Sequence, residues 1–138
     1  GCIRIHRKYS ICKILFLYYH KHMPFAMLTG VVHGNLPDGT TYEAEFIFLA
    51  LDKPDDVHRL LSLELTFAWI NEAREIPETI FRQVLQRTGR FPKKIEAPTT
   101  WSGVLMDTNP PDTDHWYYNL AEWKSLKGIN FSVNPAAW

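Results

Sequence analysis

The chain has little cysteine and no long hydrophobic run, and these shortages exclude several classes of protein. With two cysteines in 138 residues, Cys2 and Cys12, it can form neither a disulfide-rich scaffold nor a four-cysteine zinc site. The longest apolar run, residues 14–19, is far shorter than the ~20 residues that a membrane-spanning helix needs. Lys13 interrupts the basic and apolar pattern of an export signal. We therefore expect no membrane partner.

The formal net charge is zero, because fifteen basic residues balance fifteen acidic ones. A neutral chain does not have the basic excess that is typical of nucleic-acid-binding domains. The charges are unevenly distributed: no acid precedes Asp38, acids dominate from there to Ile80, and bases lead again afterwards. This pattern is typical of a solvated surface and leaves room for local basic patches.

A phosphate-binding loop of the form G-x-x-x-x-G-K-[ST] is also absent. Neither Gly30, Gly34 nor Gly39 is followed by the required Lys-Ser or Lys-Thr. The composition is otherwise that of an ordinary globular protein, with 46% hydrophobic and 22% charged residues. The length fits a single domain over residues 1–138.

The hydrophobic patterns that are present predict an α/β domain. Residues 25–36 and 40–51 are predicted strands, joined by the turn Pro37-Asp38-Gly39 into an antiparallel β-hairpin. Helices and strands then alternate, which is typical of a parallel or mixed sheet. Helices are expected at residues 52–61, 78–88 and 112–126, and strands at 63–70, 101–108 and 131–133. Residues 1–24, which are basic and aromatic, are not assigned to an element.

Two of the predicted strands end in polar residues. Asn71 and Glu72 follow the first of them, and Thr108 and Asn109 stand at the end of the second. Ligands of open α/β sheets bind at the carboxyl ends of strands. In a nucleoside triphosphatase, Asn71 would support the water shell of Mg²⁺ and the carboxylate of Glu72 would polarise the attacking water. Taken alone, each stretch is explained more simply as a strand end followed by a helix cap or a rigid turn.

Three pieces of the sequence together resemble a known family. They are residues 49–56 (LALDKPDD), 61–77 (LSLELTFAWINEAREIP) and 101–116 (WSGVLMDTNPPDTDHW). In this order and spacing they resemble the large terminase subunit of tailed bacteriophages, the ATP-driven motor that packages DNA into the procapsid and then cuts it. The resemblance covers residues 30–138 and includes the ending at 133–136.

The resemblance implies roles for five residues. Glu72 matches the catalytic carboxylate at the end of the family's Walker B strand, and Asn71 stands where many members have a metal-supporting Asp. Thr108 or Asn109, in the coupling motif, would sense the γ-phosphate. Arg59 is placed similarly to an arginine that reaches a neighbouring subunit's nucleotide in some terminases; the alternative is an exposed helix arginine.

The resemblance also implies cofactors and partners. The intact family member uses Mg²⁺ and ATP, acts on double-stranded DNA with the portal and the small terminase subunit, and works in the cytoplasm of the bacterial host. The family's Walker A loop lies upstream of the matched pieces and its nuclease domain lies downstream. The chain is therefore expected to be an internal piece of the ATPase domain, with a P-loop NTPase-like sheet that lacks the Walker A strand and loop.

Such a piece is expected to bind no cofactor and to be inactive alone. The alternative is a non-enzymatic α/β module that binds a partner or self-associates. We expect the strand 63–70 to lie in the interior of the sheet next to the strand 101–108, with Glu72 and Thr108 near the same edge. We also expect an exposed apolar patch where the absent strand would pack, and self-association there, with residues 1–24 as a candidate substitute.

Overall fold

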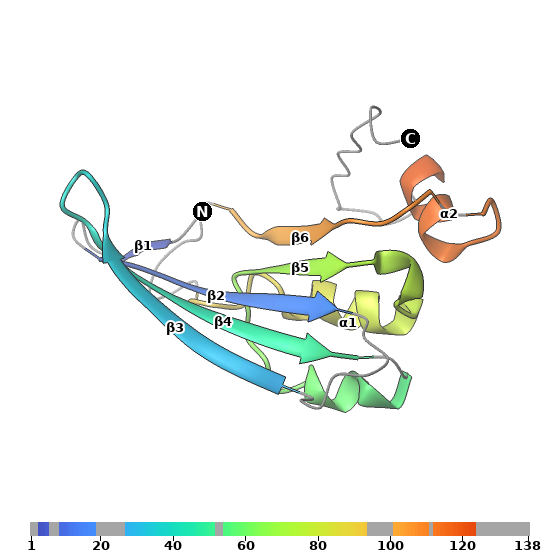
Figure 1. Ribbon diagram of the computed structural model, residues 1–138, viewed down its shortest axis with the longest axis horizontal. Helices are drawn as coiled ribbons and strands as arrows, with labels where there is room; N and C mark the ends of the chain where they lie inside the picture. Colours follow the sequence, from blue (N-terminus) through green and yellow to red (C-terminus); the bar gives the residue numbers. More distant parts are fainter. Residues whose placement is uncertain are drawn as a thin grey trace.

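The chain folds into a sheet of six strands with short helices (Figure 1). The computed structural model describes residues 3–5, 9–18, 27–51, 54–93, 101–110 and 112–123. The strands are β1 (Ile3–Ile5), β2 (Tyr9–Tyr18), β3 (Met27–Asn35), β4 (Thr41–Ala50), β5 (Phe67–Asn71) and β6 (Gly103–Met106). The helices are η1 (Pro54–Arg59), η2 (Ala73–Glu75), α1 (Glu78–Arg87) and α2 (Trp116–Trp123), of which η1 and η2 are 3₁₀ helices.

The strands form a mixed sheet with the order β3-β4-β2-β5-β6, and β1 pairs with β2 beside this path. The strands β4, β2, β5 and β6 are parallel to one another, whereas β3 and β1 run antiparallel to their neighbours. The predicted α/β class with an antiparallel pair is therefore confirmed.

The central position of β2 corrects the sequence analysis, which assigns no element to residues 1–24. Ten residues of β2 pair with β4 on one side, and five of them pair with β5 on the other. Lys13 lies within this strand, and two contacts accommodate its charge. Its Nζ lies 3.1 Å from Glu45 Oε2 and 4.7 Å from the ring centroid of Phe91. The partners of its charge are therefore distant in the sequence, and the local pattern does not reveal them.

The β3–β4 hairpin confirms the predicted turn. The backbone N–H of Gly39 donates to the carbonyl of Leu36 at 2.9 Å, and Asp38 Oδ1 accepts from the backbone N–H of Thr40 at 2.9 Å. Gly39 has a φ of 80°, a conformation that glycine adopts without steric cost. The turn residues therefore determine the local path of the chain, as expected.

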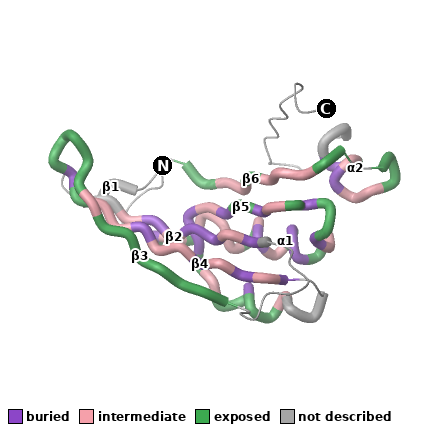
Figure 2. Tube along the Cα trace, viewed as in Figure 1, coloured by how far each residue is buried: buried purple, intermediate pink, exposed green. Residues whose placement is uncertain are grey.

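One face of the sheet carries the main core. The buried side chains of this core come from alternate positions of β2, β4 and β5, from η2, α1 and α2, and from residues between elements such as Leu60, which follows η1 (Figure 2). In α1, Ile80 and Val84 are fully buried at helical spacing, and Gly89, with a φ of 78°, follows the end of the helix as predicted. The helices η2, α1 and α2 therefore contribute buried side chains to this face.

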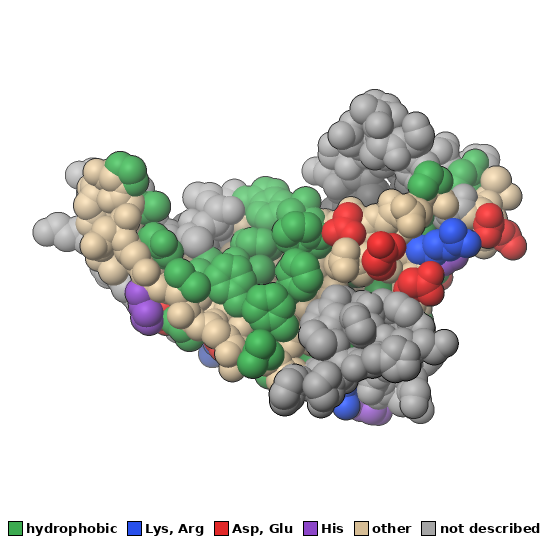
Figure 3. Space-filling model, in the orientation of Figure 1, with side chains coloured by type: hydrophobic (Ala, Val, Ile, Leu, Met, Phe, Trp, Pro, Cys, Tyr) green, Lys and Arg blue, Asp and Glu red, His purple; other side chains and the backbone are tan. Residues whose placement is uncertain are grey.

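The opposite face is rich in aromatic side chains and is partly exposed, although Cys12, Ile14 and Ala44 are buried on it. Paired residues in neighbouring strands lie on the same side of a sheet, and Phe48, Phe16, Trp69 and Leu105 form one such row across four strands. We call this surface the aromatic face, and Figure 3 shows hydrophobic side chains gathered over it. It comprises Phe16, Phe46, Phe48, Phe67, Trp69, Trp101 and Leu105.

The expected exposed apolar patch is thus present, but it lies on a face of the sheet rather than at the edge of an absent strand. Trp69, Trp101 and Leu105 are 42%, 45% and 52% exposed. The difference arises because β2 occupies the centre of the sheet, where it pairs with β4 and β5.

Three predicted elements differ in the structure. The predicted helix 52–61 is the 3₁₀ helix η1, and the predicted helix 112–126 begins at Trp116, after a turn at residues 112–115. The predicted strand 63–70 is β5, preceded by an isolated bridge between Leu65 and Thr88. The predicted strand 131–133 lies outside the described residues. In the described part of the chain, no helix has the length and apolar character that crossing a bilayer requires.

Candidate functional site

The candidate site lies where β5 and β6 end. These strands are parallel neighbours, with Ile70 paired to Met106. The backbone N–H of Asp107 donates to the carbonyl of Ile70 at 3.1 Å, and the N–H of Ala73 donates to the carbonyl of Asp107 at 3.0 Å. The prediction that these two strands are adjacent in the sheet, with Glu72 and Thr108 near the same edge, is therefore confirmed.

Asp107 is the centre of this edge. Its Oδ1 accepts from Asn71 Nδ2 at 2.7 Å and from the backbone N–H of Glu72 at 3.2 Å. Its Oδ2 accepts from the indole Nε1 of Trp69. A single carboxylate thus connects the end of β5, the residue after it and the aromatic face.

Asp107 is not among the residues that the sequence analysis proposes for the site. The available signal is its place at the end of an apolar strand, one residue before Thr108. That signal is weak because its partners Trp69 and Asn71 become apparent only when the register of β5 against β6 is known.

Glu72 has an unusual backbone conformation, with φ 52° and ψ 53° in the left-handed region. Non-glycine residues rarely adopt it because the Cβ approaches the backbone too closely. The side chain of Glu72 is exposed, and its carboxylate makes no hydrogen bond or ion pair with another residue that the structure describes. The carboxylate is therefore available to a water molecule or a ligand at this edge.

Asn71 presents its amide nitrogen to Asp107. Its amide oxygen is therefore directed away from that carboxylate, since the two atoms occupy opposite positions on the amide group. An oxygen so placed can accept a hydrogen bond from water, as the implied support of a metal's water shell requires.

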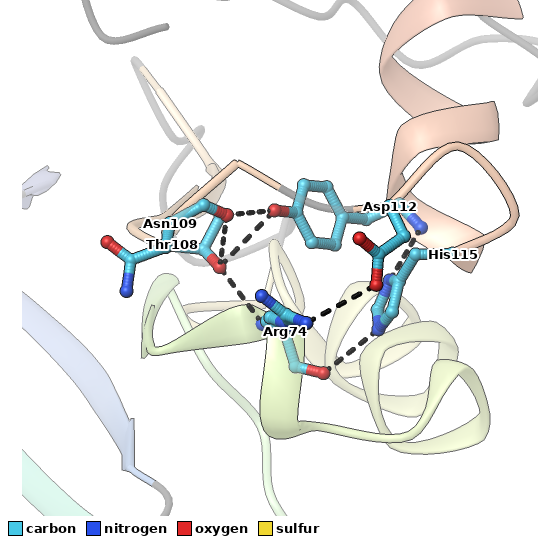
Figure 4. A network of polar contacts seen from close by, with 6 residues as sticks. Arg74, Thr108, Asn109, Asp112 and His115 are labelled. Atoms are coloured by element: carbon cyan, nitrogen blue, oxygen red, sulfur yellow. Dashed lines mark hydrogen bonds and ion pairs between the residues drawn. The ribbon is translucent and has the colours of Figure 1, made fainter.

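Thr108 and Asn109 lie in a second group of polar contacts, shown in Figure 4. Thr108 Oγ1 accepts from the backbone N–H of Arg74 at 3.2 Å and lies 3.4 Å from the hydroxyl of Tyr117. The Tyr117 hydroxyl donates to the carbonyl of Asn109. The side-chain amide of Asn109 points away from this group (Figure 4). The side chain of Thr108 thus connects the segment after β6 to η2, whereas the side chain of Asn109 is exposed.

Arg74 and His115 also belong to this second group of polar contacts. The sequence analysis does not propose either of them as a site residue. Arg74 Nη2 lies 3.4 Å from Asp112 Oδ2, and His115 Nε2 lies 3.0 Å from the carbonyl of Arg74. These contacts fix η2 to the segment between β6 and α2. Only their tertiary placement identifies the two residues.

Arg59 is not brought to this edge cluster. It is exposed on η1, which follows β4, and β2 lies between β4 and β5 in the sheet. Its implied role toward a neighbouring subunit therefore stays a prediction.

The residues at this edge fit one half of a magnesium–nucleotide site. Asn71, Glu72 and Asp107 offer the carboxylate and amide oxygens that Mg²⁺ prefers in proteins. In the described part of the chain, no group of three or more His, Cys, Asp or Glu residues could hold a metal ion. The sequence has no phosphate-binding loop to supply the other half.

Comparison of the chain with protein-family models, with curated proteins and with solved structures found no match. The resemblance to the large terminase subunit is accordingly an observation on the three sequence pieces described above.

Proposed function

We propose that the chain forms part of the ATP-hydrolysing motor of a phage large terminase, which drives DNA into the procapsid. One observation carries the proposal: Asn71 and Glu72 lie beside Asp107, Thr108 and Asn109 at the carboxyl edge of two adjacent parallel strands. The Walker B strand and the coupling motif of a P-loop NTPase-like sheet require this juxtaposition.

Each residue then has a role that its surroundings support. Glu72, with its exposed carboxylate, orients a water molecule, and Asn71 offers an amide oxygen to the water shell of Mg²⁺. Asn109 is placed to sense a phosphate, and Thr108 links it to η2. Arg59 serves a neighbouring subunit. When bound, MgATP supplies the phosphoryl group; double-stranded DNA, the portal and the small terminase subunit are the proposed partners in the host cytoplasm.

The reading frame on either side of this sequence tests the proposed identity. We expect a Walker A sequence upstream and an Asp-rich nuclease downstream. A frame that encodes neither would contradict the proposal, whatever activity the present chain has.

A phosphate-release assay with MgATP tests the proposed roles. The isolated chain should show no turnover, because positioning and electrostatic stabilisation by a phosphate-binding loop supply most of the catalysis of phosphoryl transfer. In the longer protein, Glu72→Gln should lower kcat by roughly 10²–10⁴-fold. Glu75→Gln, which changes an exposed acid on η2, is the matched control and should leave kcat near the parent value. Equal losses in both variants would remove Glu72 from the mechanism.

A non-enzymatic, self-associating module is the second candidate function. The aromatic face favours it, since exposed apolar surfaces of this kind mark interaction sites.

A further inference from the structure

The carboxylate of Asp107 is held by donors on both of its oxygens. Oδ1 accepts from Asn71 Nδ2 at 2.7 Å and from the backbone N–H of Glu72 at 3.2 Å. Oδ2 accepts from the indole Nε1 of Trp69. The backbone N–H of Asp107 donates to the carbonyl of Ile70 at 3.1 Å and so extends the pairing of β5 and β6. The carboxylate therefore cannot turn away from Glu72 without losing bonds to three donors.

The backbone of Glu72 is fixed on both sides by these and neighbouring bonds. Its N–H donates to Asp107 Oδ1, and the next N–H, that of Ala73, donates to the carbonyl of Asp107 at 3.0 Å. The carbonyl of Glu72 accepts from the N–H of Glu75 at 2.9 Å. A residue with a Cβ stays at φ 52° only where its surroundings hold it there. Since the backbone dihedrals set the direction of the Cα–Cβ bond, these bonds determine where the side chain of Glu72 leaves the chain.

The amide of Asn71 is oriented by the same oxygen. Because Nδ2 donates to Asp107 Oδ1, the amide oxygen lies on the opposite side of the amide group. Asp107 is half-buried, whereas Glu72 is exposed. One acceptor that is less accessible to water thus determines the directions of two consecutive side chains at the candidate site.

We propose that Asp107 is the positioning residue of this site, which holds the carboxylate of Glu72 and the amide oxygen of Asn71 in the directions that the reaction needs. The inference rests on the proposed function, in which these two groups act on water and on the water shell of Mg²⁺. Asp107 acts through them and does not touch the reacting atoms, because both of its oxygens are engaged by protein donors.

Three variants separate the roles of the two oxygens of Asp107. Asp107→Leu keeps the branched shape of the side chain but has no acceptor, so it releases Asn71 and Glu72 together. Asp107→Asn keeps one oxygen, and the two donors on the Oδ1 side attract it more strongly than the single indole donor does. Trp69→Phe is the matched control, because it removes the bond to Oδ2 and leaves both bonds to Oδ1 in place.

NMR spectroscopy of the full chain without nucleotide measures whether Asp107 holds the conformation of Glu72. A positive φ brings the amide proton close to the α proton of the same residue, which gives a strong NOE between them. We expect this NOE at Glu72 in the parent chain, in Trp69→Phe and in Asp107→Asn, and its loss in Asp107→Leu. Glu75, which does not have a positive φ, is the internal control and should give a weak NOE in every variant. Thermal unfolding of each variant shows that the fold is kept.

In the longer protein, kcat and KM for MgATP distinguish positioning from stability. Asp107→Leu should lower kcat by roughly 100-fold, which is the loss expected when a reacting group is displaced by ~1 Å. KM should stay within about threefold of the parent value, because binding of the substrate is not the step that is impaired. Asp107→Asn should recover most of the lost kcat, and Trp69→Phe should keep kcat near the parent value. A merely structural role would instead lower kcat in all three variants in proportion to their loss of stability.

Two results would overturn this inference and leave the proposed function intact, provided that Glu72→Gln lowers kcat. They are a parent-like kcat in Asp107→Leu, and a strong NOE at Glu72 that survives this substitution. Equal losses of kcat in Asp107→Leu, Asp107→Asn and Trp69→Phe would also overturn it. A parent protein that does not hydrolyse MgATP, or a Glu72→Gln variant with the parent kcat, would overturn the proposed function and this inference with it.

Discussion

At the scale of single residues, Glu72 combines an unfavourable backbone conformation with an exposed side chain. The left-handed conformation costs a non-glycine residue about 1–2 kcal/mol. The bond from its N–H to Asp107 helps to hold it there. A residue selected only for stability at this position would be glycine, so the presence of glutamate suggests a role for its carboxylate.

We therefore expect Glu72→Gly to stabilise the fold. The strain removed exceeds the extra flexibility of glycine in the unfolded chain, and the net gain should be about 0.5–1 kcal/mol by urea unfolding. Glu75→Gly on η2 is the control and should lose about 0.5–1 kcal/mol, because Glu75 does not have a positive φ. A loss of stability in Glu72→Gly would show that the conformation carries no strain.

At the scale of elements, Asp107 joins the ends of β5 and β6. Asp107→Ala would leave the Asn71 amide and the Trp69 indole without their acceptor. We expect a loss of about 1–3 kcal/mol in the free energy of unfolding and an altered tryptophan emission. In a double-mutant cycle with Asn71→Ala the two losses should not add, with a coupling of about 0.5–3 kcal/mol. Additive losses would mean that the Asn71–Asp107 contact contributes nothing.

The elements that could be predicted are those whose determinants are local. Pro37-Asp38-Gly39 determines the hairpin turn, and the apolar runs before Asn71 and Asp107 predict two buried strands whose polar ends meet at one edge. The start of α2 could not be predicted, because residues 112–115 are held in a turn by contacts between His115 and Arg74. The role of Asp107 likewise depends on donors from another strand.

At the scale of the whole molecule, β2 determines whether the sheet is one unit. Leu15 is fully buried and pairs with Ile47 of β4 and Ala68 of β5. Leu15→Ala should cost about 2–5 kcal/mol, measured by urea unfolding. Leu28→Ala is the control and should change stability by less than about 0.5 kcal/mol, because Leu28 is 61% exposed. Equal effects would contradict the central place of β2.

The central place of β2 could not be predicted because a strand that is buried on both faces lacks a simple alternating pattern. Cys12 and Ile14 face one side and Leu15 and Leu17 the other, so apolar residues follow one another directly. Lys13 further obscures the strand, since Glu45 and Phe91, which accommodate its charge, are distant in the sequence.

The position of β2 also has a consequence for the order of events during synthesis. β2 leaves the ribosome before β4 and β5, its two parallel partners, and β5 ends at residue 71, which is 71 − 18 = 53 residues after β2 ends. At a translation rate of ~5–20 residues per second, about 3–10 s pass between the synthesis of β2 and that of β5. The nascent chain thus passes through a stage in which an unpaired hydrophobic strand is exposed, and chaperones that hold such strands would act within this interval.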